Sequence, residues 1–446
     1  MGNSEEFDVE ANFKSYYSYI FSFFYLIQGI VQAIPAFLPF FMIYLFGEYD
    51  ISLIALIAFI ALLPWSFKFF VGMVNDKWGS DKYGRRFPFI ISFGIMGGLV
   101  FVLMSFTLPL DESIYFYLIL YLLLANIGMA VADTSLDGLI LDVVPKKSLA
   151  KVQGYTWSML MVGGAGAAGI GLLLLALDMV HLLFLITGIS LVACCSFTIL
   201  IKEPPLKSEV KIAKDLKRLL VEKKNWKIYA WTLITAMAYP MIIVAFFYLM
   251  LTSMGVVDIS TSQLSLESGE TSGSYLILTL LTAGASGLGI ILGSILMGRI
   301  ADKSRLSAIR LTYFIYLPLC LISSLLLGYV LGLAGHIAIG FVYGSITIVG
   351  QTIRGDIAKK NFPDLKSTYY ALLISFSNLG QSFGNLFLSF IFREISPLIS
   401  NFFLLYFLIS LFCFIIILIS FLIFKTIDPA EYEFEQIREE VKIVEP

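Results

Sequence analysis

Four polar side chains lie inside apolar runs that are long enough to cross a membrane. Lys68 lies in the second run, and Asn126, Asp133 and Asp137 lie in the fourth. Asp133 and Asp137 are one helical turn apart, and Asn126 lies seven residues before Asp133, so a helix places all three on one face. A charge inside a bilayer is costly, which makes such residues candidates for function. A carboxylate in a medium of low dielectric can also bind and release a proton near neutral pH.

The composition of the chain requires a membrane around it. Of 446 residues, 59% are hydrophobic and only 14% are charged, and the mean hydropathy is +0.88. Soluble domains average about 45–50% apolar and about 25% charged residues. Apolar runs of about 20 residues recur along the whole chain. Because only helices satisfy every backbone group within such runs, the expected fold class is all-α, a polytopic membrane protein.

Twelve spans account for these runs. We place them at residues 16–45, 52–74, 88–108, 114–141, 153–177, 181–201, 229–252, 275–298, 311–331, 335–355, 368–392 and 401–424. Cytoplasmic loops collect lysine and arginine. In this layout only Arg393 lies in an outer loop and Lys68 lies within a span, whereas the other twenty-eight lie in the tails, in cytoplasmic loops or at the cytoplasmic ends of spans. We therefore expect a multi-pass protein of the plasma membrane with both termini in the cytoplasm.

The longest polar stretch, residues 202–228, divides the spans into two sets of six. It contains nine Lys or Arg and four acidic residues, with apolar residues at helical spacing. This pattern predicts an amphipathic helix on the inner membrane surface. The expected organisation is an N-terminal half (1–201), this linker (202–228), a C-terminal half (229–424) and an acidic cytoplasmic tail (425–446).

A short motif follows the second span of each set. Its residues are Gly72, Asp76, Gly84, Arg85 and Arg86 in the first set and Gly298 and Asp302 in the second. A carboxylate at a helix end can pair with arginines and with the positive N-terminus of a neighbouring helix. The alternative is that these loops only set the topology through their positive charge.

This repeat resembles the pattern of the major facilitator superfamily, and the resemblance covers the whole chain. It implies two pseudo-symmetric halves of six helices, a secondary transporter that works by alternating access, and a cytoplasmic gate at the motif. Residues 25–30 and 63–69 look like the muropeptide permease and acetyl-CoA transporter branch. Residues 133–138 are also similar to the folate–biopterin transporters, and residues 84–90 to the sugar–cation symporters. The substrate stays open.

In the facilitator fold, spans one, four, seven and ten line a central cavity. The resemblance therefore adds polar residues of spans one, seven, ten and eleven to Lys68, Asn126, Asp133 and Asp137 as a substrate and coupling site. They are Gln28, Gln32, Tyr239, Gln351, Arg354, Asn378 and Gln381.

The charged residues allow two interpretations. In one, Lys68 neutralises Asp133 or Asp137, and the pair is structural, because a buried charge needs a partner. In the other, an aspartate binds a coupling proton, and Lys68 or Arg354 attracts an anionic substrate.

The expected partners are a small-molecule substrate, a coupling proton or cation, and the lipid bilayer, for a monomer that binds no nucleic acid. No cofactor or metal is expected, because the four cysteines lack metal-ligand spacing and no phosphate loop occurs. An enzyme is not expected, since neither His181 nor His336 has a catalytic neighbour in the sequence. The alternative function is a transport-inactive assembly factor or sensor.

Overall fold

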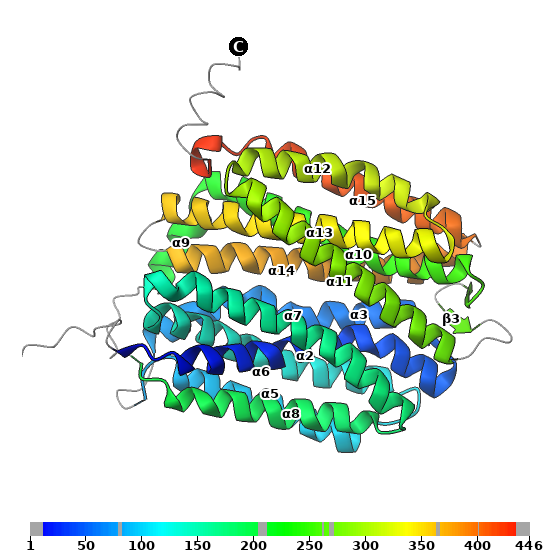
Figure 1. Ribbon diagram of the computed structural model, residues 1–446, viewed down its shortest axis with the longest axis horizontal. Helices are drawn as coiled ribbons and strands as arrows, with labels where there is room; N and C mark the ends of the chain where they lie inside the picture. Colours follow the sequence, from blue (N-terminus) through cyan, green and yellow to red (C-terminus); the bar gives the residue numbers. More distant parts are fainter. Residues whose placement is uncertain are drawn as a thin grey trace, which may run out of the picture. The chain divides into compact units, whose positions relative to one another are not determined.

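The computed structural model consists of two compact units of helices (Figure 1). Unit 1 comprises residues 1–41 and 60–216, and unit 2 comprises residues 42–59 and 217–446. The structure describes residues 12–78, 83–203, 212–260, 263–266, 272–362, 366–399 and 401–433.

Long apolar helices form unit 1 and extend into residues 42–59. They are α2 (Tyr16–Phe46), α3 (Ile51–Leu62) with η1 (Leu63–Phe67) and α4 (Lys68–Lys77), α5 (Phe87–Thr107), α6 (Ile114–Val143), α7 (Lys146–Ala176) and α8 (Val180–Phe197), which ends in η2 (Thr198–Leu200). Helix α5 packs against both α6 and α8. Helix α7 approaches α2 so closely that a Cβ on Gly163 would lie 1.9 Å from the carbonyl oxygen of Leu26. Small residues allow this kind of backbone contact between membrane helices.

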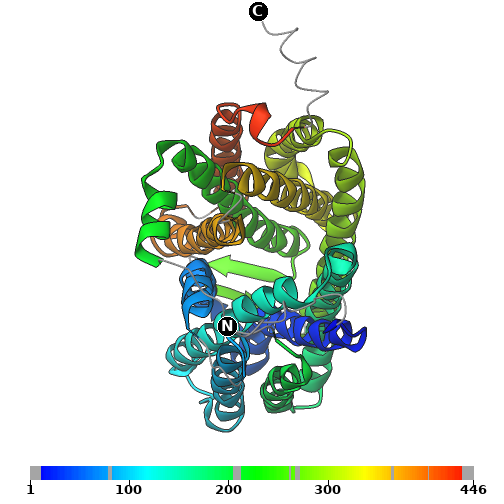
Figure 2. The ribbon, with the colours of Figure 1, turned by 90° about the vertical axis from the view of Figure 1, so that its left-hand side faces the viewer.

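Six further long helices occur among the described residues of unit 2. They are α10 (Lys223–Ser253), α11 (Ser272–Ala301), α12 (Arg305–Ile322), α13 (Gly328–Asn361), α14 (Lys366–Phe390) and α15 (Phe402–Phe424). Short turns η3 (Ser323–Leu325), η4 (Ile391–Ile395), η5 (Ser396–Leu398) and η6 (Pro429–Glu431) connect or follow them. Helix α11 packs along α13, and α10 packs against α14 and α15. Figure 2 views the helices of each unit close to end-on.

The all-helical membrane fold expected from the sequence is confirmed. Among the described residues, ten helical segments are long and apolar enough to cross a membrane. Helix α7, whose apolar part Val162–Ala176 is shorter, and α14, which has a polar stripe, bring the long helices to the expected twelve. Several helices begin earlier than the expected spans: α7 begins at Lys146, α10 at Lys223, and α13 at Gly328, which lies within the residues expected for the ninth span. A helix, α9 (Ile212–Val221), occurs within the predicted linker, whose residues 204–211 lie outside the described residues.

Unit 2 also contains three short strands that the sequence did not reveal. β1 (Glu48–Asp50), β2 (Val257–Ser260) and β3 (Gln263–Leu266) form an antiparallel sheet in the order β1-β3-β2. Tyr49 of β1 pairs with Leu264 of β3, and this pairing explains why residues 42–59 belong to unit 2. Strands of three or four residues are too short to show an alternating apolar pattern.

Candidate functional site

The second span is interrupted directly before Lys68. Helix α3 ends at Leu62, the tight turn η1 contains Pro64, and α4 begins at Lys68. Proline lacks the N–H that continues a helix and disfavours helical geometry in the residue before it. The Pro64 break therefore places the Lys68 side chain at the first residue of a new helix.

Lys68 forms ion pairs with both aspartates of α6. Its Nζ donates to Oδ2 of Asp133 and lies 3.4 Å from Oδ2 of Asp137. Asp133 is 1% exposed, whereas the Asp137 side chain is 43% exposed and its Oδ1 accepts a hydrogen bond from the Tyr25 hydroxyl. The structure thus brings together three of the predicted site residues, and it adds Tyr25, which the sequence placed in a motif without a role.

Asp133 is only half satisfied. Its Oδ1 is buried and has no hydrogen-bond partner among the described residues, and the same is true of Oε1 of buried Gln28. Gln28 lies within reach of the Asp133 carboxyl group. Both oxygens can accept a hydrogen bond from a solute, and the carboxylate oxygen of Asp133 can in addition bind a proton.

Asn126 contacts the cluster through a neighbour rather than directly. Its Oδ1 accepts a hydrogen bond of 2.9 Å from the indole Nε1 of Trp65 in η1, and its Nδ2 donates to the Leu122 carbonyl. The Trp65 ring lies 5.3 Å from the Lys68 ammonium, which is the geometry of a cation–π contact.

The other predicted binding residues, apart from Gln32 of α2, belong to unit 2. The Tyr239 ring of α10 stacks on Tyr343 of α13 with centroids 3.5 Å apart, and Gln381 of α14 lies within hydrogen-bonding reach of the Tyr343 hydroxyl. Arg354 of α13 is buried and interacts electrostatically with Tyr343.

The remaining predicted residues are more scattered. Gln32 is exposed, and Gln351 and Asn378 are half-buried. Within the described part of the chain, no hydrogen bond joins Gln32 or Gln351 to another predicted site residue. Nor do these ranges contain a group of three or more His, Cys, Asp or Glu side chains that could hold a metal ion.

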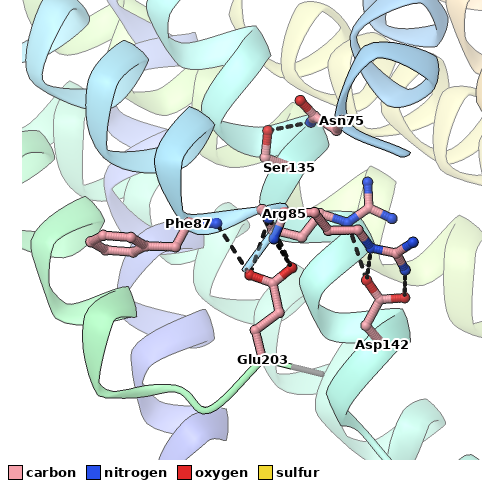
Figure 3. A network of polar contacts seen from close by, with 7 residues as sticks. Asn75, Arg85, Phe87, Ser135, Asp142 and Glu203 are labelled. Carbon is pink, nitrogen blue, oxygen red and sulfur yellow. Dashed lines mark hydrogen bonds and ion pairs between the residues drawn. The ribbon is translucent and has the colours of Figure 1, made fainter. Parts of the chain in front are cut away.

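The basic residues of the repeated motif form a network at the start of α5 (Figure 3). The guanidinium of Arg85 binds Asp142 of α6 through Nη2–Oδ1 (2.7 Å) and Nε–Oδ2 (3.2 Å), and Nε of Arg86 lies 3.1 Å from the same carboxylate. The backbone N–H groups of Arg85, Arg86 and Phe87 donate to Glu203, which follows α8. Burial raises the pKa of Glu203, and these N–H groups only partly oppose that rise.

Two glycines make room for this network. Gly84 has a φ of +81°, and a Cβ there would lie 2.3 Å from Oε2 of Glu203. A Cβ on Gly138 would lie 2.6 Å from Cζ of Arg86. Nearby, the Asn75 amide of α4 donates to the Ser135 hydroxyl of α6 (Figure 3).

Unit 2 repeats the network. Nε of Arg305, at the start of α12, lies 3.0 Å from Oδ2 of Asp356 on α13. Glu433, beyond α15, accepts hydrogen bonds from the backbone N–H of Leu306 and from the Ser304 hydroxyl. In each unit, an arginine that begins the third span therefore binds an aspartate of the fourth, and a glutamate beyond the sixth caps the third.

Of the two motif aspartates, Asp302 is the one whose side chain is described. Asp302 is 84% exposed, and its closest ion pair, with Arg305, measures 3.9 Å. The Asp76 side chain lies outside the described residues. A Cβ on Gly72 or Gly298 would make only ordinary contacts, with Thr134 and Ile348. Four acidic residues of these networks could not be picked out from the sequence: Asp142, Asp356, Glu203 and Glu433. The one available signal was that both glutamates follow the last span of a half.

Long apolar helices in two units, with charged side chains paired inside them, define an integral membrane protein of the transporter type. The family model for the Major Facilitator Superfamily matches residues 19–363, and the chain belongs to this superfamily. The expected family and transporter class are thereby confirmed, and an enzyme is excluded.

A weaker similarity relates the chain to one curated protein. "Probable folate-biopterin transporter 4" of Arabidopsis thaliana is 27% identical over 159 residues. The match covers 34% of this chain and only 31% of that protein, so most of the relative's length has no counterpart in the alignment.

Solved transporter structures share the fold over nearly the whole chain. The nucleoside transporter NupG superposes with a TM-score of 0.65 at 11% identity, over 92% of this chain and 99% of that chain. The E. coli fucose:proton symporter FucP gives 0.60 at 14%, over 91% and 98%. A bacterial homolog of the human lysosomal transporter Spinster, inward-facing and occupied, gives 0.60 at 15%, over 94% and 98%. At these identities the likeness shows the fold alone.

Proposed function

We propose that this chain is a secondary active transporter that moves a small organic solute by alternating access and is driven by protons that bind Asp133. In this mechanism the halves 1–201 and 229–424 rearrange so that the binding site opens first to one side of the membrane and then to the other. Residues 202–228 link the two halves.

The observation that supports this proposal is the half-satisfied Asp133. Its Oδ2 is paired with Lys68 while its buried Oδ1 has no donor among the described residues. A proton on Oδ1 would neutralise Asp133 and leave Lys68 to the more exposed Asp137, so protonation changes the pairing within the cluster. Such a change in charge is what a coupling site requires, because it gives the loaded and empty states different energies.

The coupling experiment uses purified protein in proteoliposomes that contain a pH-sensitive dye. Folate, biopterin, uridine and fucose are the first probes, because the relatives are named for these or for their chemical classes. We expect one probe class to acidify the vesicle interior as it enters, and to accumulate when the outside is made acidic. If a probe accumulates without any proton movement, Asp133 has no coupling role.

The variant Asp133→Asn separates coupling from structure. A permanently neutral amide mimics the protonated carrier, so counterflow exchange should persist while pH-driven accumulation is abolished. If the Lys68–Asp133 pair is only structural, Asp133→Asn should instead cost up to about 3–5 kcal/mol of stability, because Lys68 loses its buried partner and keeps only the more exposed Asp137. In that case the double variant Asp133→Asn/Lys68→Met should restore the melting temperature of the wild type. Wild-type accumulation in a correctly folded Asp133→Asn protein contradicts the coupling role.

We also propose that the motif residues form the cytoplasmic gate, with Arg85 and Arg86 as its cations and Asp142 as their partner in the state described. The support is the double contact of Arg85 with Asp142, since bidentate pairs of this kind are strong and geometrically specific.

A further inference from the structure

Arg354 is a buried cation that no acid neutralises. It is 6% exposed, and its Nε donates to the carbonyl oxygen of Gly350, one turn earlier on α13, at 3.1 Å. No ion pair joins it to a carboxylate among the residues that the structure describes. Burying an uncompensated charge costs several kcal/mol, so an unpaired buried arginine calls for an external partner.

The groups that face Arg354 do not supply that partner. The side chains that interact with it electrostatically are Tyr313, Tyr343 and Tyr370, and none is a carboxylate. The nearest acid along the helix, Asp356, is bound to Arg305. The two amino groups of the guanidinium make no hydrogen bond within the described ranges, so they can present a fork of N–H donors.

Unit 1 contains a cation, Lys68, that acidic side chains neutralise. Lys68 has two aspartates, at Oδ2 of Asp133 and of Asp137. The sequence left open whether Lys68 or Arg354 attracts an anion. Because the lysine is already paired and the arginine is not, the arginine is the available one.

The surroundings of Arg354 are aromatic. A Cβ on Gly350 would lie 3.5 Å from Nη2 of Arg354 and 4.0 Å from the Trp231 ring, so Gly350 lies beside both and a methyl group is the most that would fit there without a shift. Tyr343 stacks on Tyr239, and Thr347 and Gln381 lie within reach of its hydroxyl. Flat aromatic walls with a few polar groups suit a planar ring that bears the anion.

We infer that Arg354 binds the carboxylate or phosphate group of an aromatic organic anion, and that this anion is the transported solute. The inference rests on the proposed transport function, because it names the substrate class of that carrier.

The test compares charged and neutral probes of one shape. Melting curves of the full-length protein in detergent are recorded with 4-aminobenzoate, 4-aminobenzamide, phenyl phosphate and phenol. We expect at least one of the two anions to raise the melting temperature in proportion to its concentration, and the neutral partner to have no effect. The two anions distinguish a carboxylate site from a phosphate site.

Variants assign the effect to Arg354. Arg354→Met should abolish the anion-dependent shift, and Arg354→Lys should weaken the apparent affinity roughly tenfold, because an ammonium cannot form the bidentate fork. Arg393→Gln, which removes an exposed arginine of the same unit, should retain the wild-type response. Without ligand, Arg354→Met should melt above the wild type, since it removes an uncompensated buried charge.

Two results overturn the inference. One is a lower melting temperature of ligand-free Arg354→Met, which would make Arg354 a structural residue. The other is an equal response of wild type and Arg354→Met to both anions, including no response in either. The vesicle assay separates this failure from that of the transporter. If a neutral probe enters the vesicles together with protons, the chain is a proton-coupled carrier but Arg354 is not an anion site. If anions bind in an Arg354-dependent manner but are not transported, the anion site exists and the transport function fails.

Discussion

At the scale of single residues, Asn126 is linked to the ion pairs of Lys68 through the side chain of Trp65. It holds the indole N–H of Trp65, and the Trp65 ring in turn faces the Lys68 ammonium. Asn126 therefore acts on the ion pair by positioning an aromatic ring, and its own side chain does not contact either aspartate in the described structure.

Asn126→Leu should lower the free energy of unfolding by about 1–3 kcal/mol, because the buried Trp65 N–H loses its acceptor. The measurement is a thermal or denaturant melt of the purified variant. In a Trp65→Phe background the same change should cost clearly less, since the donor is then absent. Equal costs in both backgrounds would show that the hydrogen bond is not the reason for the loss.

The pairing of charges could be predicted from the sequence, and its details could not. Lys68, Asp133 and Asp137 had to find partners because isolated charges are too costly in a bilayer. That Trp65 and Tyr25 complete the cluster depends on the Pro64 break and on the hydrogen bond from Tyr25 of α2 to Asp137 of α6, which no periodicity reveals. The partners of Arg85 were missed for the same reason, since Asp142 and Glu203 come from other helices.

At the scale of elements, the start of α5 is shaped by a loop that folds back on it. Gly84 adopts a left-handed conformation so that Glu203 can reach the first backbone N–H groups of the helix. A helix N-terminus is stabilised by a carboxylate in this position, through both hydrogen bonds and the helix dipole.

Gly84→Ala should destabilise the protein by about 1–2 kcal/mol or more, because a left-handed conformation costs a residue with a Cβ about that much, and the new methyl group would meet Glu203. The matched control is Gly166→Ala on α7, where a Cβ would meet nothing within 4 Å. That change should be neutral or stabilise by up to about 1 kcal/mol, because alanine is the better helix former. Identical melting temperatures for the two variants would contradict this explanation.

The proposed cytoplasmic gate also depends on a contact between elements, the pairing of Arg85 and Arg86 at the start of α5 with Asp142 of α6. Asp142→Asn should weaken the contacts of Arg85 and Arg86 and shift the population of the carrier towards the inward-facing state. We expect turnover in vesicles to fall more than substrate affinity, and Asp76→Asn to act in the same direction. Unchanged kinetics in correctly inserted variants would leave the motif as a topology signal only.

At the scale of the whole molecule, the distribution of charge makes a prediction about sidedness. The end of α11 and the start of α12 carry Arg299, Lys303 and Arg305, whereas the loop between α5 and α6 carries Asp111 and Glu112. The first connection should therefore face the cytoplasm and the second the outside.

Single cysteines at the exposed positions Lys303 and Glu112 test this orientation. In intact cells, an impermeant maleimide should label Glu112→Cys and spare Lys303→Cys until the membrane is opened. The natural cysteines, Cys194, Cys195, Cys320 and Cys413, are all buried, so the background should be low. Labelling of Lys303→Cys but not of Glu112→Cys in intact cells would show that the orientation is the opposite of the one expected.

The two glutamate caps also have a consequence for the order in which the protein matures. Each glutamate comes after the sixth helix of its half. The N-termini of α5 and α12 therefore lack their capping carboxylate when these helices first leave the ribosome. Glu203 is synthesised 230 residues before Glu433, which corresponds to roughly 10–50 s at ordinary translation rates. During that interval the first half can close its own network, while the second half still awaits its cap. A nascent chain arrested between these two residues should therefore already protect the start of α5 from protease.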